Sequence, residues 1–274
     1  MKLLCGSHTL ELDAPRVMGV LNVTPDSFYD GGRHGDFAQA IAHARQMAAD
    51  GAAIIDVGGE STRPGANPVS EDEELRRVVP VIGALARDGF LVSVDTRRAA
   101  VMRAATAAGA AMVNDVAALR EPGAMEAVAG SGVAVCLMHM HGEPATMQDA
   151  PHYDDVAEEV LAFLAARVDA TLRAGIARER IAVDPGFGFG KTLEHNLQLM
   201  RALPRLVAAG YPVVAGLSRK GSLGTITGRP LEERLPASLA AALAAVARGA
   251  AIVRVHDVRE TVDALKVWRA FERG

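Results

Sequence analysis

The stretch that decides the fold runs from Ile181 to Lys191 and reads IAVDPGFGFGK. A short apolar run ends at Asp184, and a turn rich in proline and glycine follows it. Apolar runs without alternation are typical of strands buried on both faces, as in parallel sheets. Parallel α/β proteins carry their chemistry where such strands end. The stretch therefore indicates a buried parallel strand with a functional group at its carboxyl end.

The same unit recurs along the chain, because short apolar runs that end in polar or glycine residues alternate with longer alanine-rich segments of helical period. The runs expected to be strands are Val17 to Leu21, Ile54 to Val57, Leu91 to Val94, Ala111 to Val113, Val133 to Met138, Ile181 to Val183, Val213 to Leu217 and Ala251 to Val255. Eight strand-then-helix units are the number that closes a barrel of parallel strands. We therefore predict an α/β fold, a single-domain (β/α)8 TIM barrel over residues 16–274. Residues 1–15 are expected to be a short N-terminal preamble, a hairpin that caps the barrel bottom.

Signals for helix ends support this division. A helix over Asp36–Asp50 is expected to end at Gly51, and one over Tyr153–Ala174 at Gly175. Ser70 followed by Glu73 gives the pattern of a capping box. A doubly wound open sheet is the alternative, but it has five or six strands and a switch point. No Gly-x-Gly-x-x-Gly opens a helix after the first strand, so the dinucleotide-binding version has no support.

Composition excludes several classes of protein. Lys and Arg total 29 and Asp and Glu total 33, a formal charge of −4 without a dense basic stretch, which argues against general nucleic-acid binding. The two cysteines, Cys5 and Cys136, cannot build a disulfide framework. Met1 to Asp13 carries acidic residues and no apolar run, so we expect no signal peptide there. A stretch of about 18 apolar residues, long enough to cross a membrane, does not occur. We expect a cytoplasmic protein with no membrane contact.

Only four of the basic residues are lysines: Lys2, Lys191, Lys220 and Lys266. Arginine has replaced lysine almost everywhere, so a retained lysine indicates a site that needs a compact point charge. Lys191 and Lys220 follow the sixth and seventh predicted strands. We expect Lys191 to decorate or cap the start of the next helix, outside the site, and Lys220 to lie in the site.

Polar residues follow every predicted strand, and in a barrel these ends share one face. They are Asn22 with Thr24 to Ser27, Asp56 to Gly65, Asp95 to Arg97, Asn114-Asp115, His139 to Gly142, Asp184 to Lys191, Ser218 to Gly221, and Arg254 to Asp257. Turn chemistry alone does not account for polar groups at all eight ends. The set predicts a substrate site at this face.

These residues resemble the dihydropteroate synthase family of pterin-binding enzymes. Its signatures are similar to Met18–Phe28 followed by Asp30-Gly31-Gly32, to Asp56–Gly65, to Asp184–Lys191, to Ser218–Lys220 and to the Arg-Val-His-Asp-Val run that begins at Arg254. The resemblance extends from about Val17 to Phe271. It implies a transferase of folate (tetrahydrofolate) biosynthesis, a sulfonamide target that needs Mg²⁺ and forms a homodimer through its barrel helices. The implied reaction condenses 6-hydroxymethyl-7,8-dihydropterin diphosphate with 4-aminobenzoate to give 7,8-dihydropteroate and diphosphate.

The resemblance assigns the pterin site to Asp184, Asp95 and Asn114. A carboxylate at the first of these positions can accept hydrogen bonds from the amino-pyrimidinone edge of a pterin, although a single buried Asp or Asn is more often a satisfied turn or cap. Lys220 matches the family lysine that contacts both substrates. Asp184, Lys220 and Arg254 are the implied catalytic residues. Met138 and Phe189 are expected to wall the flat heterocycle, with an ordinary core role an equal alternative.

The departing diphosphate needs cations and backbone donors. Arg254 and His256 follow the eighth predicted strand, where barrels often bind phosphate, and Arg254 is also expected to stack on the pterin. The resemblance adds Thr62 and Arg63 for the diphosphate and Asn22 as the Mg²⁺ ligand, with diphosphate oxygens and water completing the shell.

The connections Val23–Gly35 and Gly58–Val69 are longer than the 2–6 residues usual for such loops, and long loops at an active face are commonly lids. We expect them to order over the substrates and to bring Thr62, Arg63, Pro64 and Phe28 around the aminobenzoate. One position departs from the family: Gly221 stands where the family has serine, and Ser222 follows it. The serine contact to the aminobenzoate carboxylate is therefore expected from Ser222 or from backbone N–H groups.

Three other functions fit part of the pattern. His139-Met140-His141 is compatible with zinc binding, but the histidines His8, His34, His43, His152 and His195 fall away from the strand ends. A folate-binding methyltransferase that serves a corrinoid would share the pterin contacts but lack a diphosphate signature. A non-catalytic pterin-binding paralogue is expected to have lost one of the family's site residues, and none is lost.

Overall fold

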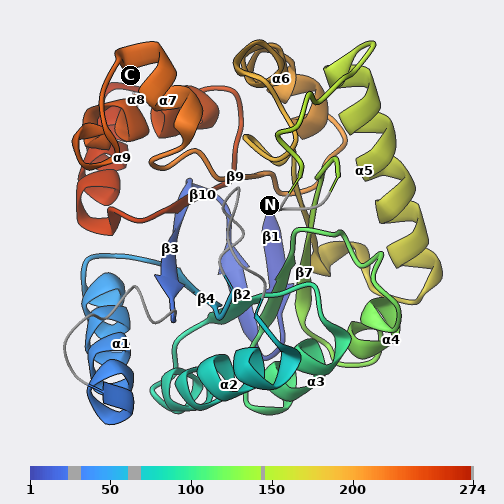
Figure 1. Ribbon diagram of the computed structural model, residues 1–274, viewed down its shortest axis with the longest axis vertical. Coiled ribbons are helices and arrows are strands. Elements are labelled where there is room, and N and C mark those ends of the chain that lie inside the picture. The colour runs from blue at the N-terminus through green and yellow to red at the C-terminus, as the bar shows by residue number, and fades with distance from the viewer. Residues whose placement is uncertain (24–31, 61–68, 143–145, 273–274) are drawn as a thin grey trace.

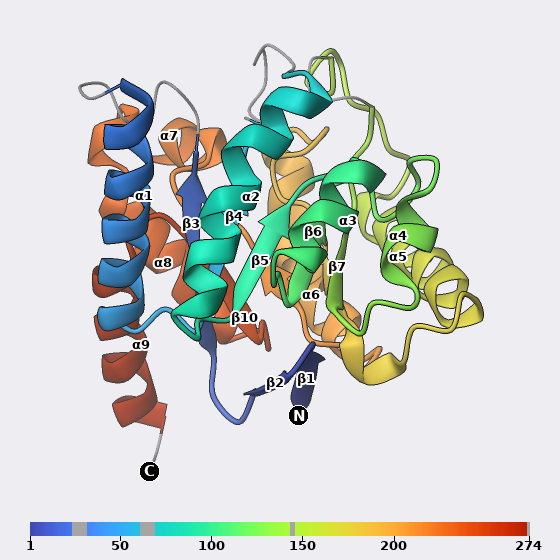
Figure 2. The ribbon, with the colours of Figure 1, turned by 90° about the horizontal axis from the view of Figure 1, so that it is seen from below.

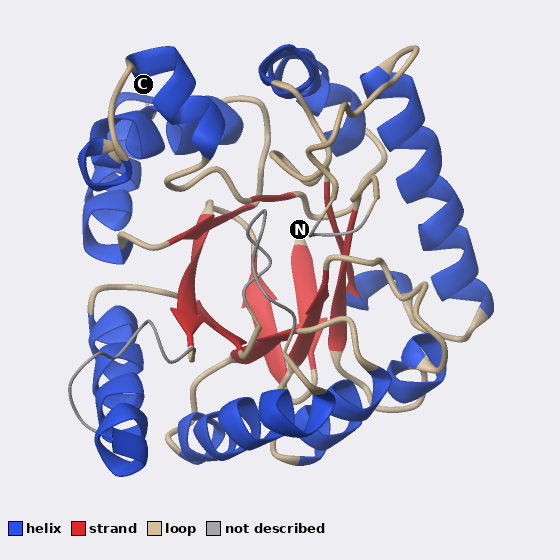
Figure 3. Cartoon of the chain, viewed as in Figure 1, coloured by secondary structure: helices blue, strands red, loops and turns tan. Residues whose placement is uncertain are grey.

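The computed structural model describes residues 1–23, 32–60, 69–142 and 146–272, with the backbone only for 32–36. In these residues eight parallel strands form a barrel with helices around its outside (Figures 1 and 3). The sheet order is β8-β7-β6-β5-β4-β3-β10-β9. A parallel bridge between Val183 and Val213, with Val183 N–H donating to Pro212 O at 2.9 Å, joins its two edge strands. This near closure confirms the predicted TIM barrel and excludes the open doubly wound sheet.

The strands run in the order that the apolar runs predict. The barrel strands are β3 Arg16–Asn22, β4 Ile54–Gly58, β5 Val92–Asp95, β6 Met112–Asp115, β7 Ala134–Met138, β8 Ile181–Asp184, β9 Val214–Ala215 and β10 Ile252–Val255. The helices are α1 Gly32–Ala49, α2 Glu71–Arg87, α3 Ala99–Ala107, α4 Ala124–Val128, α5 Val156–Arg173, α6 Leu193–Val207, α7 Gly221–Thr227, α8 Leu235–Val246 and α9 Val258–Glu272, with short 3-10 turns η2 Arg178–Arg180 and η3 Leu231–Glu233.

The strand β9 is shorter than the predicted Val213–Leu217. Val213, just before it, forms only an isolated parallel bridge, with Val183. At its other end the chain turns at once, since Lys220 N–H donates to Leu217 O at 3.2 Å and Arg219 adopts a left-handed φ of 59°. The early turn brings the segment 217–220 to the barrel mouth.

The first residues form a two-stranded antiparallel hairpin, β1 Lys2–Cys5 with β2 His8–Glu11. Leu3, Cys5 and Leu10 are buried in one apolar cluster with residues from the lower parts of the barrel strands, such as Met18 and Ile252. Figure 2 shows the hairpin below the barrel, at the end from which β3 starts. It closes the bottom of the barrel, so the open end is the one where the strands finish.

The predicted cap at Ser70 is confirmed, but its capping box and two helix starts differ from the prediction. The α1 helix begins at Gly32 and not at Asp36. Ser70 caps α2 by accepting Glu73 N–H at 3.3 Å, but the Glu73 carboxylate binds Arg76 and Arg77 instead of completing the capping box. The α5 helix begins at Val156, later than the predicted Tyr153, because the Asp155 carboxylate accepts the N–H groups of the first turn. The side chain of Tyr153 is then available to donate to Gly190 O at 2.8 Å.

Candidate active site

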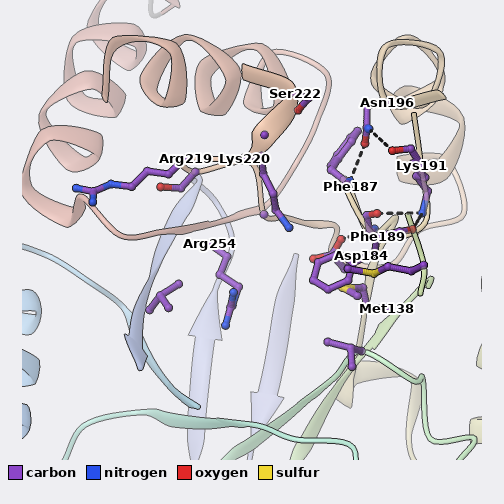
Figure 4. Close-up of a pocket in the computed structure, with 18 of the residues that line it drawn as sticks. Met138, Asp184, Phe187, Phe189, Lys191, Asn196, Arg219, Lys220, Ser222 and Arg254 are labelled. Carbon is purple, nitrogen blue, oxygen red and sulfur yellow. Dashed lines mark hydrogen bonds between the residues drawn. The ribbon is translucent and has the colours of Figure 1, made fainter. Parts of the chain in front are cut away.

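A cavity of about 650 Å³ opens at the carboxyl ends of the strands. Residues from the ends of β3, β5, β6, β7, β8 and β10 and from the turns after β8 and β9 line it (Figure 4). The predicted site residues that the structure brings together here are Asn22, Asp95, Asn114, Met138, Asp184, Phe189, Lys220, Arg254 and His256. Four other predicted residues, Phe28, Thr62, Arg63 and Pro64, lie outside the described residues, as do the central parts of both predicted lids.

Strand register explains why the polar groups meet. The parallel pairing of β5 with β6 sets Asp95 beside Asn114, and the pairing of β7 with β8 sets Met138 beside Asp184. In a parallel barrel these paired positions lie at the same level of the mouth. Residues that are far apart in the sequence therefore form one ring around the cavity.

Asp184 ends β8 and is only 4% exposed. Its Oδ1 accepts the backbone N–H of Gly186 at 2.7 Å. Burial raises the pKa of this carboxyl group above its ordinary value, and the Gly186 N–H and the cations of Lys220 and Arg254 oppose the increase. The site thus holds a buried acceptor with positive charge facing it.

Arg254 binds two carboxylates at the mouth. Its Nε donates to Asp56 Oδ2 at 2.6 Å, and its Nη2 donates to Asp95 Oδ2 at 2.6 Å. Burial favours the neutral form of the guanidinium, but the two carboxylates outweigh it and raise the pKa of Arg254. Burial, reinforced by the negative charge of Asp56, raises the pKa of Asp95 to about 7, even though Arg254 opposes the shift. Two carboxylates share one cation, so the cluster is poised to gain a proton or further donors.

Two oxygens of this cluster have no hydrogen-bond partner among the described residues: Asp56 Oδ1 and Asp95 Oδ1, both buried. A buried acceptor without a donor costs about 1–3 kcal/mol. Asp95 lines the cavity, but its Oδ1 is itself buried.

Lys220 and Phe189, which both line the cavity, are in direct contact. Lys220 Nζ lies 4.0 Å from the centre of the Phe189 ring, within the range of a cation–π contact. Phe189 also packs on a buried cluster of Val116, Met138, Met140 and Met147. These residues give the cavity an apolar wall with a cation against it; Figure 4 labels Met138, Phe189 and Lys220.

The last two strands supply further polar groups. His256 follows β10, and its Nδ1 lies 3.1 Å from Ser218 Oγ. Arg219 forms a bidentate ion pair with Asp257 at the outer edge of the cavity. The α7 helix starts at Gly221, and both Gly221 and Ser222 line the cavity. The hydroxyl that the family carries on the first of these positions is thus present one residue later.

Asn22 ends β3 at the cavity, half-buried. Its amide makes no hydrogen bond to another described side chain. One amide oxygen is a sparse protein ligand set, but Mg²⁺ usually keeps several waters and binds through substrate phosphates. Within the described parts of the chain, no group of three or more His, Cys, Asp or Glu residues could hold a metal ion. The residues present therefore fit Mg²⁺ only as an ion shared with a phosphate ligand.

Comparisons with known proteins identify the family. The model of the family described as pterin binding enzyme matches residues 18–256. Dihydropteroate synthase of Haemophilus influenzae is 49% identical over 272 residues, 98% of each chain. The chain belongs to the dihydropteroate synthase family. Its members are transferases, and the folate-binding methyltransferase and the non-catalytic paralogue are set aside by this match.

Solved dihydropteroate synthases have the same fold. The Xanthomonas albilineans enzyme with 4-aminobenzoic acid superposes with a TM-score of 0.94 at 55% identity, over 100% of this chain and 98% of that one. A complex of the Xanthomonas albilineans enzyme with 7,8-dihydropteroate has a TM-score of 0.91 at 51% identity and covers both chains fully. No described helix of this chain is long and apolar enough to cross a bilayer.

Sequence reasoning placed Asp56 in the polar run at the end of the second strand but gave this residue no role of its own. It lies in β4 with no exposed surface, and besides Arg254 it accepts Asn114 Nδ2 at 3.0 Å. The available signal was a carboxylate inside an otherwise apolar strand, since a buried charge of this kind requires a paired cation. That signal identifies Asp56 but not its partner Arg254, which lies two strands away on β10 and 198 residues away in the sequence.

The prediction for Lys191 was wrong. It precedes α6, whose N-cap is Thr192, but its side chain turns inward and is 3% exposed. Its Nζ lies 2.9 Å from His139 Nδ1. Burial first, and then the positive charge of Lys191, lowers the pKa of His139 to about 3. One of the two ring nitrogens of His139 thus contacts Lys191 and is not available to a zinc ion.

Proposed function

We propose that this chain condenses 6-hydroxymethyl-7,8-dihydropterin diphosphate with 4-aminobenzoate and forms 7,8-dihydropteroate and diphosphate in folate biosynthesis. The observation that carries the proposal is the convergence of Asp184, Lys220 and Arg254 on one cavity. The relatives with 4-aminobenzoic acid and with 7,8-dihydropteroate bound support these substrates. The proposed catalytic residues are the same three.

The pterin would lie against the apolar wall of Met138 and Phe189. Asp184 is the acceptor for the donors of its amino-pyrimidinone edge, with Asp95 and Asn114 next to each other on the neighbouring strands. All three residues line the cavity, which supports this placement. Lys220 would then stand at the junction of the two substrates.

The diphosphate would lie toward Arg254 and His256, which follow the last strand. Arg63 and Thr62 are proposed to join them from the loop after β4, and Asn22 is proposed to bind Mg²⁺ together with the diphosphate. When bound, Mg²⁺ would supply positive charge to the leaving group. Because Arg254 is already held by Asp56 and Asp95, its guanidinium is oriented before the substrate arrives, which lowers the cost of reorganisation.

The reaction needs no protein nucleophile. The bond between the pterin methylene carbon and the diphosphate oxygen breaks, and its electron pair leaves with diphosphate. The amine nitrogen of 4-aminobenzoate forms the new bond to that carbon and releases a proton. We propose that breakage comes first, with the cation stabilised by the pterin and by the charge of Asp184. A pre-steady-state burst of diphosphate that is independent of the arylamine supports this order; strict dependence of diphosphate release on arylamine concentration contradicts it.

The aminobenzoate would occupy the outer part of the cavity near α7. Ser222 is the hydroxyl available for its carboxylate, with Pro64 and Phe28 proposed to cover the ring. We also propose a cytoplasmic homodimer formed through barrel helices. In support of the dimer, α9 exposes Val267 at 56% and Phe271 at 84%, four residues apart on one face.

Turnover by the purified protein tests the proposal. Labelled 4-aminobenzoate is incubated with the pterin diphosphate and Mg²⁺, and labelled 7,8-dihydropteroate and diphosphate are measured. Equal amounts of both products, lost on chelation and restored by Mg²⁺, are expected. Hydrolysis of the diphosphate without formation of a carbon–nitrogen bond would refute it.

A further inference from the structure

The loop Gly186–Gly190 forms one side of the cavity. It follows Asp184 directly and includes Phe189. Its backbone is packed against the end of β7. Gly186 has a left-handed φ of 68°, and a side chain there would overlap the carbonyl oxygen of His139. Gly190, with a φ of 62°, is in the same relation to the carbonyl of His141. Glycine is therefore required at both positions, and the loop lies along the His139–His141 segment.

Lys191 links this loop to the His139–His141 segment through hydrogen bonds. Its Nζ donates to Gly186 O at 2.9 Å and to Phe189 O at 3.0 Å, and it contacts His139 Nδ1 at 2.9 Å. The ammonium group has three protons and finds three acceptors, so its donor capacity matches its surroundings. No carboxylate of a described residue forms a salt bridge with it. A buried lysine without an ion-pair partner is costly and points to a specific requirement.

The contacts of Lys191 reach the pterin site in two ways. Gly186, whose carbonyl it holds, donates its N–H to Asp184 Oδ1 at 2.7 Å. Phe189, whose carbonyl it also holds, carries the ring that faces Lys220. Other groups fix the rest of the loop: Asn196 accepts Gly188 N–H at 2.7 Å, and Tyr153 holds Gly190 O. Figure 4 shows Lys191 and Asn196 beside this loop, and both residues also line the cavity.

We propose that Lys191, with His139 as its acceptor, is the positioning residue that holds the Gly186–Gly190 loop, and through it the carboxylate of Asp184, in the geometry that binds the pterin. The proposal rests on the assignment of Asp184 to the pterin. It gives a function to Lys191 and to the first histidine of the His139–His141 triplet, neither of which the reaction itself uses.

The charge of Lys191 matters as well as its hydrogen bonds. Burial lowers the pKa of Lys191 to about 7, and Asp184 opposes this while Lys220 reinforces it. In turn Lys191 helps Lys220 and Arg254 to keep Asp184 ionised. The titratable groups around it are Asp184 on β8, Lys220 after β9, His139 and His141 at the end of β7, and Tyr153 before α5. When Lys191 loses its proton, it can no longer donate to three acceptors, and the field that keeps Asp184 charged weakens.

Binding measurements on matched lysine variants test the proposal. Lys191→Met keeps length but removes all donors and the charge, whereas Lys266→Met removes an exposed lysine on α9 that pairs with Asp263. We expect Lys191→Met to bind the pterin about tenfold or more weakly, with little change in the KM for 4-aminobenzoate. The pH below which pterin binding is lost should rise, because Asp184 is protonated more readily. Lys266→Met should behave as the parent. Unchanged pterin affinity in a folded Lys191→Met protein overturns the proposal.

Histidine variants and the unmodified protein give independent results. His139→Asn keeps an acceptor near Nδ1 and should bind pterin much as the parent does, whereas His139→Phe should reproduce part of the Lys191→Met defect. In the parent, binding that requires protonated Lys191 must by linkage raise the pKa of that lysine. Lysine-labelled NMR should therefore show Lys191 titrating at higher pH with pterin bound. If the pKa of Lys191 stays the same or falls when pterin binds, the inference is overturned, even if the variants do not fold. If the inference is overturned in this way but Lys266→Met still turns over substrate, the proposed function stands.

Discussion

Arg254 Nη2 lies 2.6 Å from Asp95 Oδ2, so an arginine on β10 is ion-paired with a carboxylate on β5 across the mouth of the barrel. The same guanidinium holds Asp56 through Nε. A planar fork can bind two carboxylates at once, whereas the single nitrogen of lysine cannot do so in this geometry. The pairing also fixes where the remaining guanidinium donor points.

Arg254→Lys is expected to weaken binding of the pterin diphosphate and to lower turnover about tenfold or more, since one charged hydrogen bond of the fork is lost. Binding of pterin without diphosphate should fall less, because the charge beside Asp95 remains. Calorimetry with the two ligands measures the difference. Arg45→Lys, at an exposed pair with Asp88, is the matched control and should change neither affinity. An equal loss of affinity for pterin and for pterin diphosphate would show that Arg254 does not bind the diphosphate.

Stability should depend on pH through Asp95. Its pKa is raised from 3.8 to about 7 in the folded protein, mainly by burial. A raised pKa means that the native state holds a proton that the unfolded chain has released, so this contribution is complete below pH 3.8 and is lost as the pH rises through about 7. Urea unfolding between these values should show a steeper decline in the free energy of unfolding for the parent than for Asp95→Asn. If the free energy of unfolding declines equally with pH in the parent and in Asp95→Asn, the burial of Asp95 in this cluster is contradicted.

Ser222→Ala tests how this chain accommodates the departure at Gly221. If Ser222 binds the aminobenzoate carboxylate, its loss should raise the KM for 4-aminobenzoate by about tenfold, as for a hydrogen bond to a charged group. The KM for the pterin diphosphate should not change. Thr227→Ala, on the same short helix but outside the cavity lining, is the control. A Ser222→Ala protein with parental kinetics would assign the carboxylate to backbone donors.

Most of the barrel follows from local pattern. Buried parallel strands need apolar residues on both faces, so runs such as Ile181–Val183 mark their positions within two residues of the observed strand. The end of β9 was less predictable. Val213 to Leu217 is apolar throughout apart from Gly216, and only the turn at Arg219, a three-dimensional feature, ends the strand early.

Site residues were predictable where their own position in the sequence marks them. They were not predictable where their role depends on contact with a residue far away in the sequence. Asp184 is marked by its place between a strand and a glycine-rich turn. Asp56 and Lys191 are not, because their roles come from Arg254, 198 residues away in the sequence, and from His139, 52 residues away. Spacing along one sequence carries no information on such contacts. The residues Phe28, Thr62, Arg63 and Pro64 stay predictions.

The central claim is that Asp184 binds the pterin edge, and calorimetry on Asp184→Asn tests it most directly. The substitution keeps the size of the side chain but replaces an acceptor with a donor, which leaves paired groups facing each other wrongly at a cost of about 1–3 kcal/mol or more. The account predicts that binding of pterin, with or without diphosphate, and turnover both collapse in a folded protein and that added Mg²⁺ does not restore them. If Asp184→Asn binds free pterin with the affinity of the parent, the assignment of Asp184 to the pterin pocket is wrong.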